Sequence, residues 1–219
     1  VHCSEYLEWR QLFKADSVTM IFPAYHLGSP SSMFGHTLLR LDSSSTTKTE
    51  WLSFAVNFGA NISNDDNSIV YAYRGLAGGY PGTFISEPYF KKIQEYNRIE
   101  HRDIWEYKLN LTPEETEIMI EHLWELKTIN FDYFFFDENC SYRLLELLEV
   151  ARPGIELTDE FRLTAIPVDT VRTVQEAGLI EGTKYRPARA TEIQYALKDM
   201  PDQQQNLVYQ LSNDIDVLQ

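Results

Sequence analysis

The sequence predicts an α+β fold, with strands early in the chain and helices later. Its front half contains short segments rich in β-branched and aromatic residues, bounded by Gly, Pro, Asn or Ser. Its back half contains apolar residues at helical spacing behind helix-start signals. A doubly wound sheet would alternate strands and helices along the chain, so this order disfavours that class.

The expected strands share a high content of Val, Ile, Phe, Tyr and Trp. They cover residues 18–22, 33–41, 51–58, 69–73 and 104–109. In the last segment Trp105, Tyr107 and Leu109 alternate with polar residues, as expected for a sheet with one wet face. A Ser- and Thr-rich connector at residues 42–50 would join two strands as a hairpin.

The clearest helix start lies at Thr112, which is the expected N-cap. Pro113 follows at the first helical position, and Glu115 completes a capping box. A stripe of apolar residues then predicts a helix to about residue 127. Further helices are expected at residues 5–13, 87–98, 139–150 and 169–177, and from about residue 203.

Composition excludes several classes of function. The 219 residues include 33 acidic and 19 basic side chains, a formal net charge of −14, so nucleic-acid binding is disfavoured. No stretch approaches the roughly 18 consecutive apolar residues that would span a bilayer. Two cysteines are too few for a disulfide framework or a structural zinc site, and no metal site is expected.

One of the two cysteines, Cys140, occupies the first turn of an expected helix. Leu144 and Leu148 follow at i+4 and i+8, so the thiol points toward the buried stripe of that helix. A helix N-terminus stabilises an anion, and the thiolate is the nucleophilic form of cysteine. The alternative is that Cys140 is a small apolar residue packed under the helix.

A nucleophilic thiol needs a base, and His36 is the preferred candidate. It lies in a segment that is apolar on both faces, where an imidazole must find a polar partner. His26 is the reserve candidate. Across the expected hairpin, Asn57 is placed to accept the second ring N–H of His36 and to fix its tautomer. A turn residue at the end of a strand is an equal alternative for Asn57.

Four separated motifs resemble the Lnb N-terminal periplasmic domain family, which includes a bacterial lipoprotein N-acyltransferase. The likeness extends over residues 18–154. The motifs are Ser-Ser-Met-Phe-Gly-His-Thr-Leu-Leu-Arg-Leu at 31–41, Asn-Phe-Gly at 57–59, the glycine-rich stretch at 74–82, and Asn-Cys-Ser-Tyr-Arg at 139–143. More distantly, a strand His followed by Asn-Cys at a helix start is similar to permuted papain-like enzymes such as lecithin:retinol acyltransferase.

The resemblance implies a permuted papain-like fold with an antiparallel sheet carrying His36 and a helix carrying Cys140. It implies Cys140 as nucleophile, His36 as base and Asn57 as third member. The expected organisation is an N-terminal helical extension at 1–17, the catalytic domain at 18–154, and a helical C-terminal extension at 155–219. Candidate substrate or oxyanion residues are Tyr25, His26, Ser31, Arg40, Tyr80, Asn139, Tyr142 and Arg143.

The implied reaction is acyl transfer through a thioester on Cys140, without a cofactor. The resemblance implies a phospholipid acyl donor, a lipoprotein N-terminus as acceptor, and a periplasmic site facing the membrane, reached through parts outside this chain. An apolar channel is expected from Phe131, Tyr133, Phe134, Phe135, Phe136 and a flexible loop at 75–82, although such rings are also ordinary core residues.

Two other functions remain open. The same pair of residues would serve a cysteine amidase or peptidase that acts on cell-wall peptides. A non-catalytic binding module on the same fold is the third hypothesis. An apolar tunnel favours lipid donors, whereas a polar groove favours peptides.

Overall fold

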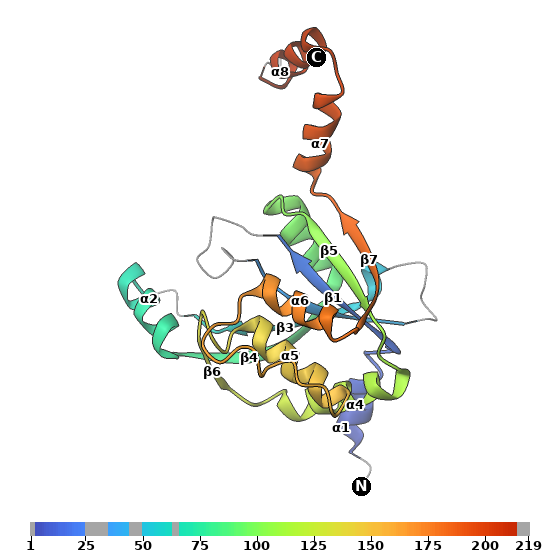
Figure 1. Cartoon of the computed structure of the whole chain (residues 1–219), viewed down its shortest axis with the longest axis vertical. Coiled ribbons are helices and arrows are strands. Elements are labelled where there is room, and N and C mark those ends of the chain that lie inside the picture. Colours follow the sequence, from blue (N-terminus) through green and yellow to red (C-terminus); the bar gives the residue numbers. More distant parts are fainter. Residues whose placement is uncertain (1–2, 25–34, 44–49, 63–65, 214–219) are drawn as a thin grey trace.

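The computed structural model describes residues 3–24, 35–43, 50–62 and 66–213 of the chain. The described residues form one seven-stranded antiparallel sheet with the order β6-β4-β3-β2-β1-β5-β7, together with eight α-helices, which confirms the α+β class (Figure 1). The strands are β1 (Ser17–Pro23), β2 (Leu38–Asp42), β3 (Phe54–Ala60), β4 (Tyr80–Pro88), β5 (Ile104–Leu109), β6 (Phe131–Tyr133) and β7 (Ile180–Arg186).

The expected helices are present, with shifted ends. The helices are α1 (Ser4–Arg10), α2 (Ser68–Ala77), α3 (Tyr89–Ile93), α4 (Pro113–Leu126), α5 (Cys140–Ala151), α6 (Pro167–Glu176), α7 (Arg189–Lys198) and α8 (Asp202–Asn213), with the 3-10 turn η3 (Glu50–Leu52) and the π-helix η4 (Gln94–Ile99). The capping box before α4 is confirmed, because the Thr112 hydroxyl accepts from the Glu115 N–H and the Glu115 carboxylate accepts from the Thr112 N–H.

Helices cover both faces of the sheet. On one face, Met20, Leu39 and Val56 join the largest core cluster with side chains of α4, α5 and α6. On the other face, α3 and η4 pack on a smaller cluster that includes Ile21 and Leu38. Because strand side chains alternate, the central strands have two buried faces. The helices α7 and α8 project away from the sheet (Figure 1).

The prediction of a strand at residues 69–73 is wrong, because this segment lies in α2. The Asn67 side chain accepts hydrogen bonds from the N–H groups of Ile69 and Val70 and so caps the helix. This cap outweighs the strand preference of the β-branched residues. Gly78 ends α2 in the left-handed conformation, with φ of 72°, which glycine adopts without strain.

The glycine-rich stretch is therefore not the flexible loop that the sequence suggested. Gly75 lies within α2, where a Cβ atom would come within 2.1 Å of the Phe135 ring. The Phe135 N–H also donates to the Gly75 carbonyl at 2.9 Å. Glycine here lets α2 approach the segment that leads to Cys140.

The segment expected as a helical C-terminal extension also contributes a strand. β7 pairs antiparallel with β5 at one edge of the sheet, and α6 supplies Val171 and Val174 to the largest core cluster. The sequence patterns did not predict β7, because its residues are largely polar and its side chains are mostly exposed or half-buried. β6 was missed for a different reason, since it is only three residues long.

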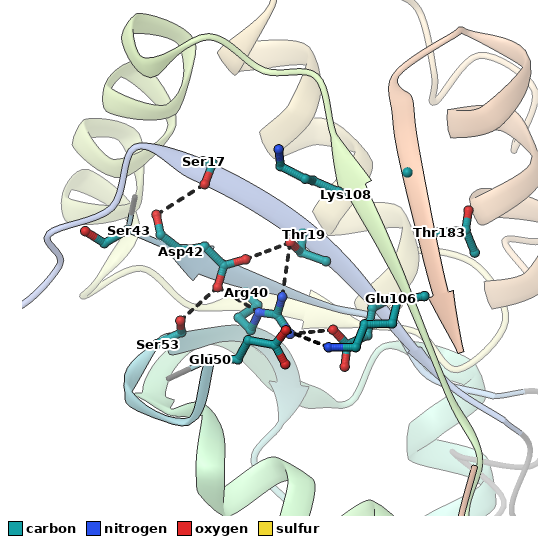
Figure 2. Close-up of a pocket in the computed structure, with 12 residues that line it drawn as sticks. Ser17, Thr19, Arg40, Asp42, Ser43, Glu50, Ser53, Glu106, Lys108 and Thr183 are labelled. Atoms are coloured by element: carbon teal, nitrogen blue, oxygen red, sulfur yellow. Dashed lines mark hydrogen bonds and ion pairs between the residues drawn. The ribbon is translucent and has the colours of Figure 1, made fainter. Parts of the chain in front are cut away.

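A buried ion-pair network ties the central strands together on the face opposite the largest core (Figure 2). The Arg40 guanidinium donates to Asp42, Glu106 and Thr19, which joins β2, β5 and β1. Arg40 is 5% exposed and Glu106 is 3% exposed. Glu106 also accepts from Arg186 of β7, so one carboxylate connects two buried or half-buried cations.

Replacing Glu106 by Leu is expected to lower the free energy of unfolding by about 3 kcal/mol, because the buried Arg40 guanidinium loses one of its two carboxylate partners. Glu181→Gln is the matched control, since Glu181 pairs with Lys108 in an exposed position; its effect is expected to stay below about 1 kcal/mol. Chemical denaturation measures both. Equal, small losses in the two variants would contradict a stabilising role for the network.

Candidate active site

Cys140 is the first residue of α5, and Asn139 fixes that helix end. The Asn139 side-chain oxygen accepts from the N–H groups of Ser141 and Tyr142, at 3.0 and 3.3 Å. Its amide nitrogen donates to the carbonyls of Phe135 and Ala165. The cap therefore also anchors the helix start to segments on either side of it in sequence.

The structure brings Cys140, His36 and Asn57 together in a chain of contacts. The Cys140 sulfur lies 3.0 Å from His36 Nδ1, and His36 Nε2 lies 2.8 Å from Asn57 Oδ1. Because an amide oxygen only accepts, the Asn57 contact places a proton on Nε2 and leaves Nδ1 to take the thiol proton. The arrangement is a thiol, a base and an orienting group in series.

Strand register explains how Asn57 reaches His36. Leu39 pairs with Val56 in the β2–β3 ladder, so Asn57 stands opposite Leu38. His36 lies two residues before Leu38, in the segment that leads into β2. The contact between His36 and Asn57 is therefore diagonal. Leu38, two residues after His36, stands directly opposite Asn57.

The surroundings of the thiol act on its pKa in opposite directions. Burial raises the pKa of Cys140, while the charge and hydrogen bond of His36, the Thr37 backbone and the Ser141 side chain lower it, with a net result of about 7. The Thr37 hydroxyl in turn donates to the Ser141 hydroxyl at 3.0 Å. Ionisation near neutral pH is the property that a thiol nucleophile requires.

A cavity of about 190 Å³ adjoins the imidazole side of the pair. His36 and Asn57 line it together with aromatic rings and with charged residues of α3, η4 and the following turn. The lining is His36, Asn57, Phe58, Gly59, Ala60, Ile62, Lys92, Glu95, Tyr96, Glu100, Tyr133 and Phe135. Cys140 itself is 3% exposed and is not among the described residues that line this cavity.

Two buried tyrosines flank the pair, and the sequence assigned neither a role at the sulfur. The Tyr96 ring centre lies 6.1 Å from the His36 ring centre. Tyr133 belongs to the same buried cluster as Cys140. Tyr133 had been only a candidate for an apolar channel, because sequence spacing does not show that β6 ends beside α5.

Other candidate residues take varied positions. Tyr80 belongs to the buried cluster that includes Cys140, but its hydroxyl donates to Asp66. Arg143 of α5 pairs with Glu138, which precedes the helix, and with Glu146 within it, and its guanidinium lies over the Phe131 ring. Tyr142 packs against the largest core cluster. Tyr25, His26 and Ser31 lie outside the described residues.

Arg40 belongs to the ion-pair network on the polar side of the sheet rather than to the thiol pair. A larger cavity, about 480 Å³, lies over that network, and its described lining includes neither Cys140 nor His36. Opposite charges within it pair with one another, as Lys184 does with Glu50. We therefore place the candidate chemistry at the smaller cavity.

In the part of the chain that the structure describes, no helix combines the length and apolar character needed to cross a bilayer. A search of curated proteins finds no match. Among solved structures, the chain is similar to the crystal structure of a type VI secretion system effector, TseH, with 11% identity and a TM-score of 0.48, covering 81% of this chain and 96% of that one.

A family model matches residues 5–177. This range begins at the second residue of α1 and includes every following element through α6. The match includes Cys140, His36 and Asn57, the three residues that the structure brings into contact. The chain belongs to the Lnb N-terminal periplasmic domain family.

Proposed function

We propose that this chain is a thiol acyltransferase that works through a thioester on Cys140. The observation that carries the proposal is the contact chain in which the Cys140 sulfur lies 3.0 Å from His36 Nδ1 and His36 Nε2 lies 2.8 Å from Asn57. The thiol stands at a helix N-terminus, and its pKa is lowered to about 7. These features favour a nucleophile over a passive core cysteine.

In the proposed reaction, His36 Nδ1 takes the thiol proton and the Cys140 sulfur bonds to an acyl carbonyl carbon. The carbonyl electron pair moves onto oxygen. When that pair returns, the bond to the leaving group breaks, and the leaving group departs with the proton from His36. The acyl acceptor then gives its proton to His36 and attacks the thioester carbon, and the Cys140 thiolate is released. Asn57 keeps the imidazole oriented through both halves.

For the substrates, we propose a phospholipid ester as acyl donor and the N-terminal amine of a lipoprotein as acceptor. Membership of a family described as an Lnb N-terminal periplasmic domain supports a location in the periplasm. Aromatic side chains at the cavity, Phe58, Tyr133 and Phe135, supply apolar surface for an acyl group. We also propose that this fold is a permuted papain-like fold.

A second candidate is a cysteine amidase that cuts peptide amides of the cell wall. The charged side chains of Lys92, Glu95 and Glu100 at the cavity favour this alternative, because a peptide offers polar groups to them and an acyl chain does not. The volume of about 190 Å³ also suits a small group better than a long chain. The identity of the acyl donor therefore discriminates the two enzymes.

The direct test uses a Cys3→Ser variant, in which Cys140 is the single thiol. After incubation with phosphatidylethanolamine and phosphatidylglycerol vesicles, intact-mass analysis is expected to show one added fatty-acyl group that hydroxylamine removes. Further replacement of Cys140 by Ala is expected to abolish the adduct. A lack of adduct with lipids, combined with cleavage of a peptidoglycan peptide, would favour the amidase. Neither activity in the folded protein would favour a non-catalytic module.

Replacing His36 by Ala is expected to slow alkylation of Cys140 by iodoacetamide at pH 7 by about ten-fold or more. The variant removes the imidazole that lowers the thiol pKa, so the thiolate fraction falls. The smaller side chain opens the site, so lost access does not explain a slower rate. His122→Ala on α4 is the control and should match the parent. An unchanged rate in His36→Ala would contradict an activated thiol.

A further inference from the structure

We propose that a second cavity, between α4 and α5, binds the hydrocarbon chain of the acyl group whose carbonyl carbon Cys140 attacks. This inference rests on the proposed acyl transfer and names the class of donor, a neutral ester with a chain longer than butyryl. The cavity beside His36, at about 190 Å³, suits a small group, so a longer chain needs another compartment. The structure offers one on the helix that begins with Cys140.

The second cavity has a volume of about 280 Å³ and is lined by side chains of α4, α5, β4 and β6. The helices α4 and α5 lie side by side (Figure 1). The lining is mostly apolar and consists of Phe84, His122, Leu126, Phe131, Arg143, Glu146, Leu147 and Val150. From the sequence, Phe131 was a candidate for an apolar channel and Arg143 a candidate for substrate binding. A concave site with mostly apolar walls is the usual form of a site for an apolar ligand.

The position of the second cavity along α5 suits a chain that starts at Cys140. The α5 residues in its lining begin with Arg143, one turn after Cys140, and end with Val150. At about 1.5 Å per residue, they lie roughly 5–15 Å from Cys140 along the helix axis. The carbons of a butyryl group extend over only about 4 Å, because each C–C bond is about 1.5 Å long. A butyryl group therefore stops short of most of this cavity, whereas a longer chain can enter it.

Aromatic rings connect the second cavity with the surroundings of the thiol. Phe84 and Phe131 line the cavity and also pack on the buried cluster that contains Cys140. Phe58 belongs to that cluster, and its ring centre lies 5.0 Å from that of Phe84 and 5.9 Å from that of Phe131. Phe58 also lines the cavity beside His36. One group of rings therefore borders both cavities, so a chain that extends from Cys140 toward the second cavity meets apolar side chains.

The charges at the second cavity favour a neutral chain over an anionic ligand. Arg143 pairs with Glu146 at 2.9 Å and also pairs with Glu138, so two carboxylates share one guanidinium. His122 lies 3.2 Å from a third carboxylate, that of Glu125. A free fatty acid or a phosphate would place another negative charge near these groups, which is unfavourable. The hydrocarbon part of an ester carries no charge and meets no such repulsion.

The test compares p-nitrophenyl decanoate with p-nitrophenyl butyrate as acyl donors for the Cys3→Ser protein, each below the concentration at which it aggregates. The two esters share the reacting carbonyl and the leaving group and differ in chain length alone. Acylation of the Cys140 sulfur releases p-nitrophenolate, and intact mass identifies the adduct. Each CH₂ group that becomes buried is worth about a four-fold gain in binding. Acylation by decanoate is therefore expected to be about 100-fold faster than acylation by butyrate at equal, low ester concentration.

Val150→Trp fills the far end of the second cavity, and Val168→Trp is the matched control. Val150 lines the cavity and is 36% exposed, whereas Val168 on α6 is 46% exposed and is not among the residues that line it. Val150→Trp is expected to slow acylation by decanoate about ten-fold or more and to keep acylation by butyrate within about three-fold of the parent. Val168→Trp is expected to leave both rates unchanged. Leu126→Trp, on the α4 side of the cavity, should repeat the result for Val150→Trp.

The butyrate rate also reports whether a variant folds and keeps its thiol chemistry. Equal rates for the two esters in the parent would overturn the acyl-chain site while leaving the thiol enzyme intact. A preference for decanoate that survives in both Val150→Trp and Leu126→Trp would also overturn it, since the chain then binds elsewhere. Parallel losses with both esters in these two variants would overturn it as well, because they indicate a general effect on the protein. A parent protein that neither ester acylates would overturn the proposed function itself.

Discussion

The contact between the Cys140 sulfur and the His36 imidazole is the interaction on which this site depends. Burial alone would keep the thiol protonated and inert, because a thiolate loses its hydration there. The imidazole reverses that effect and brings the thiol pKa to about 7. The same burial excludes water, which strengthens the attraction between the two groups. The pair is thus useful only if its geometry is held tightly.

The fold supplies that geometry from three separate segments. Asn139 anchors the start of α5 to the carbonyls of Phe135 and Ala165, which fixes the sulfur. The segment that enters β2 carries His36, and its Thr37 bonds to Ser141 of α5. β3 carries Asn57 to the far side of the imidazole. Each segment is tied into the central sheet or the helix layer, so the contact is a consequence of the core packing.

Much of this arrangement was predictable from the sequence. The capping signals of Thr112, Pro113 and Glu115 predicted α4, because they act locally and need no tertiary partner. The residues alone made Cys140 and His36 candidates, with a packed core cysteine as the alternative, and the resemblance to the Lnb family implied their pairing. The structure places the two side chains in contact.

The rest depended on information that a local pattern does not carry. The cap from Asn67 turned the β-branched residues at 69–73 into a helix, and the polar character of β7 concealed an edge strand. The place of Tyr133 in the buried cluster with Cys140 depends on tertiary packing, which a local pattern does not show. Arg40 was a candidate site residue because it lies in a motif that resembles the family. In the structure its side chain instead pairs with Asp42 and Glu106 and so connects strands of the sheet.

The most direct measurement of the central claim is a titration of the Cys140 thiolate by its ultraviolet absorbance. The difference between the Cys3→Ser protein and the same protein with Cys140→Ala isolates one thiol across the pH range. The account predicts that the thiolate signal increases as the pH rises through about 7. A midpoint at or above about 8.5, the value of an ordinary cysteine, would contradict it.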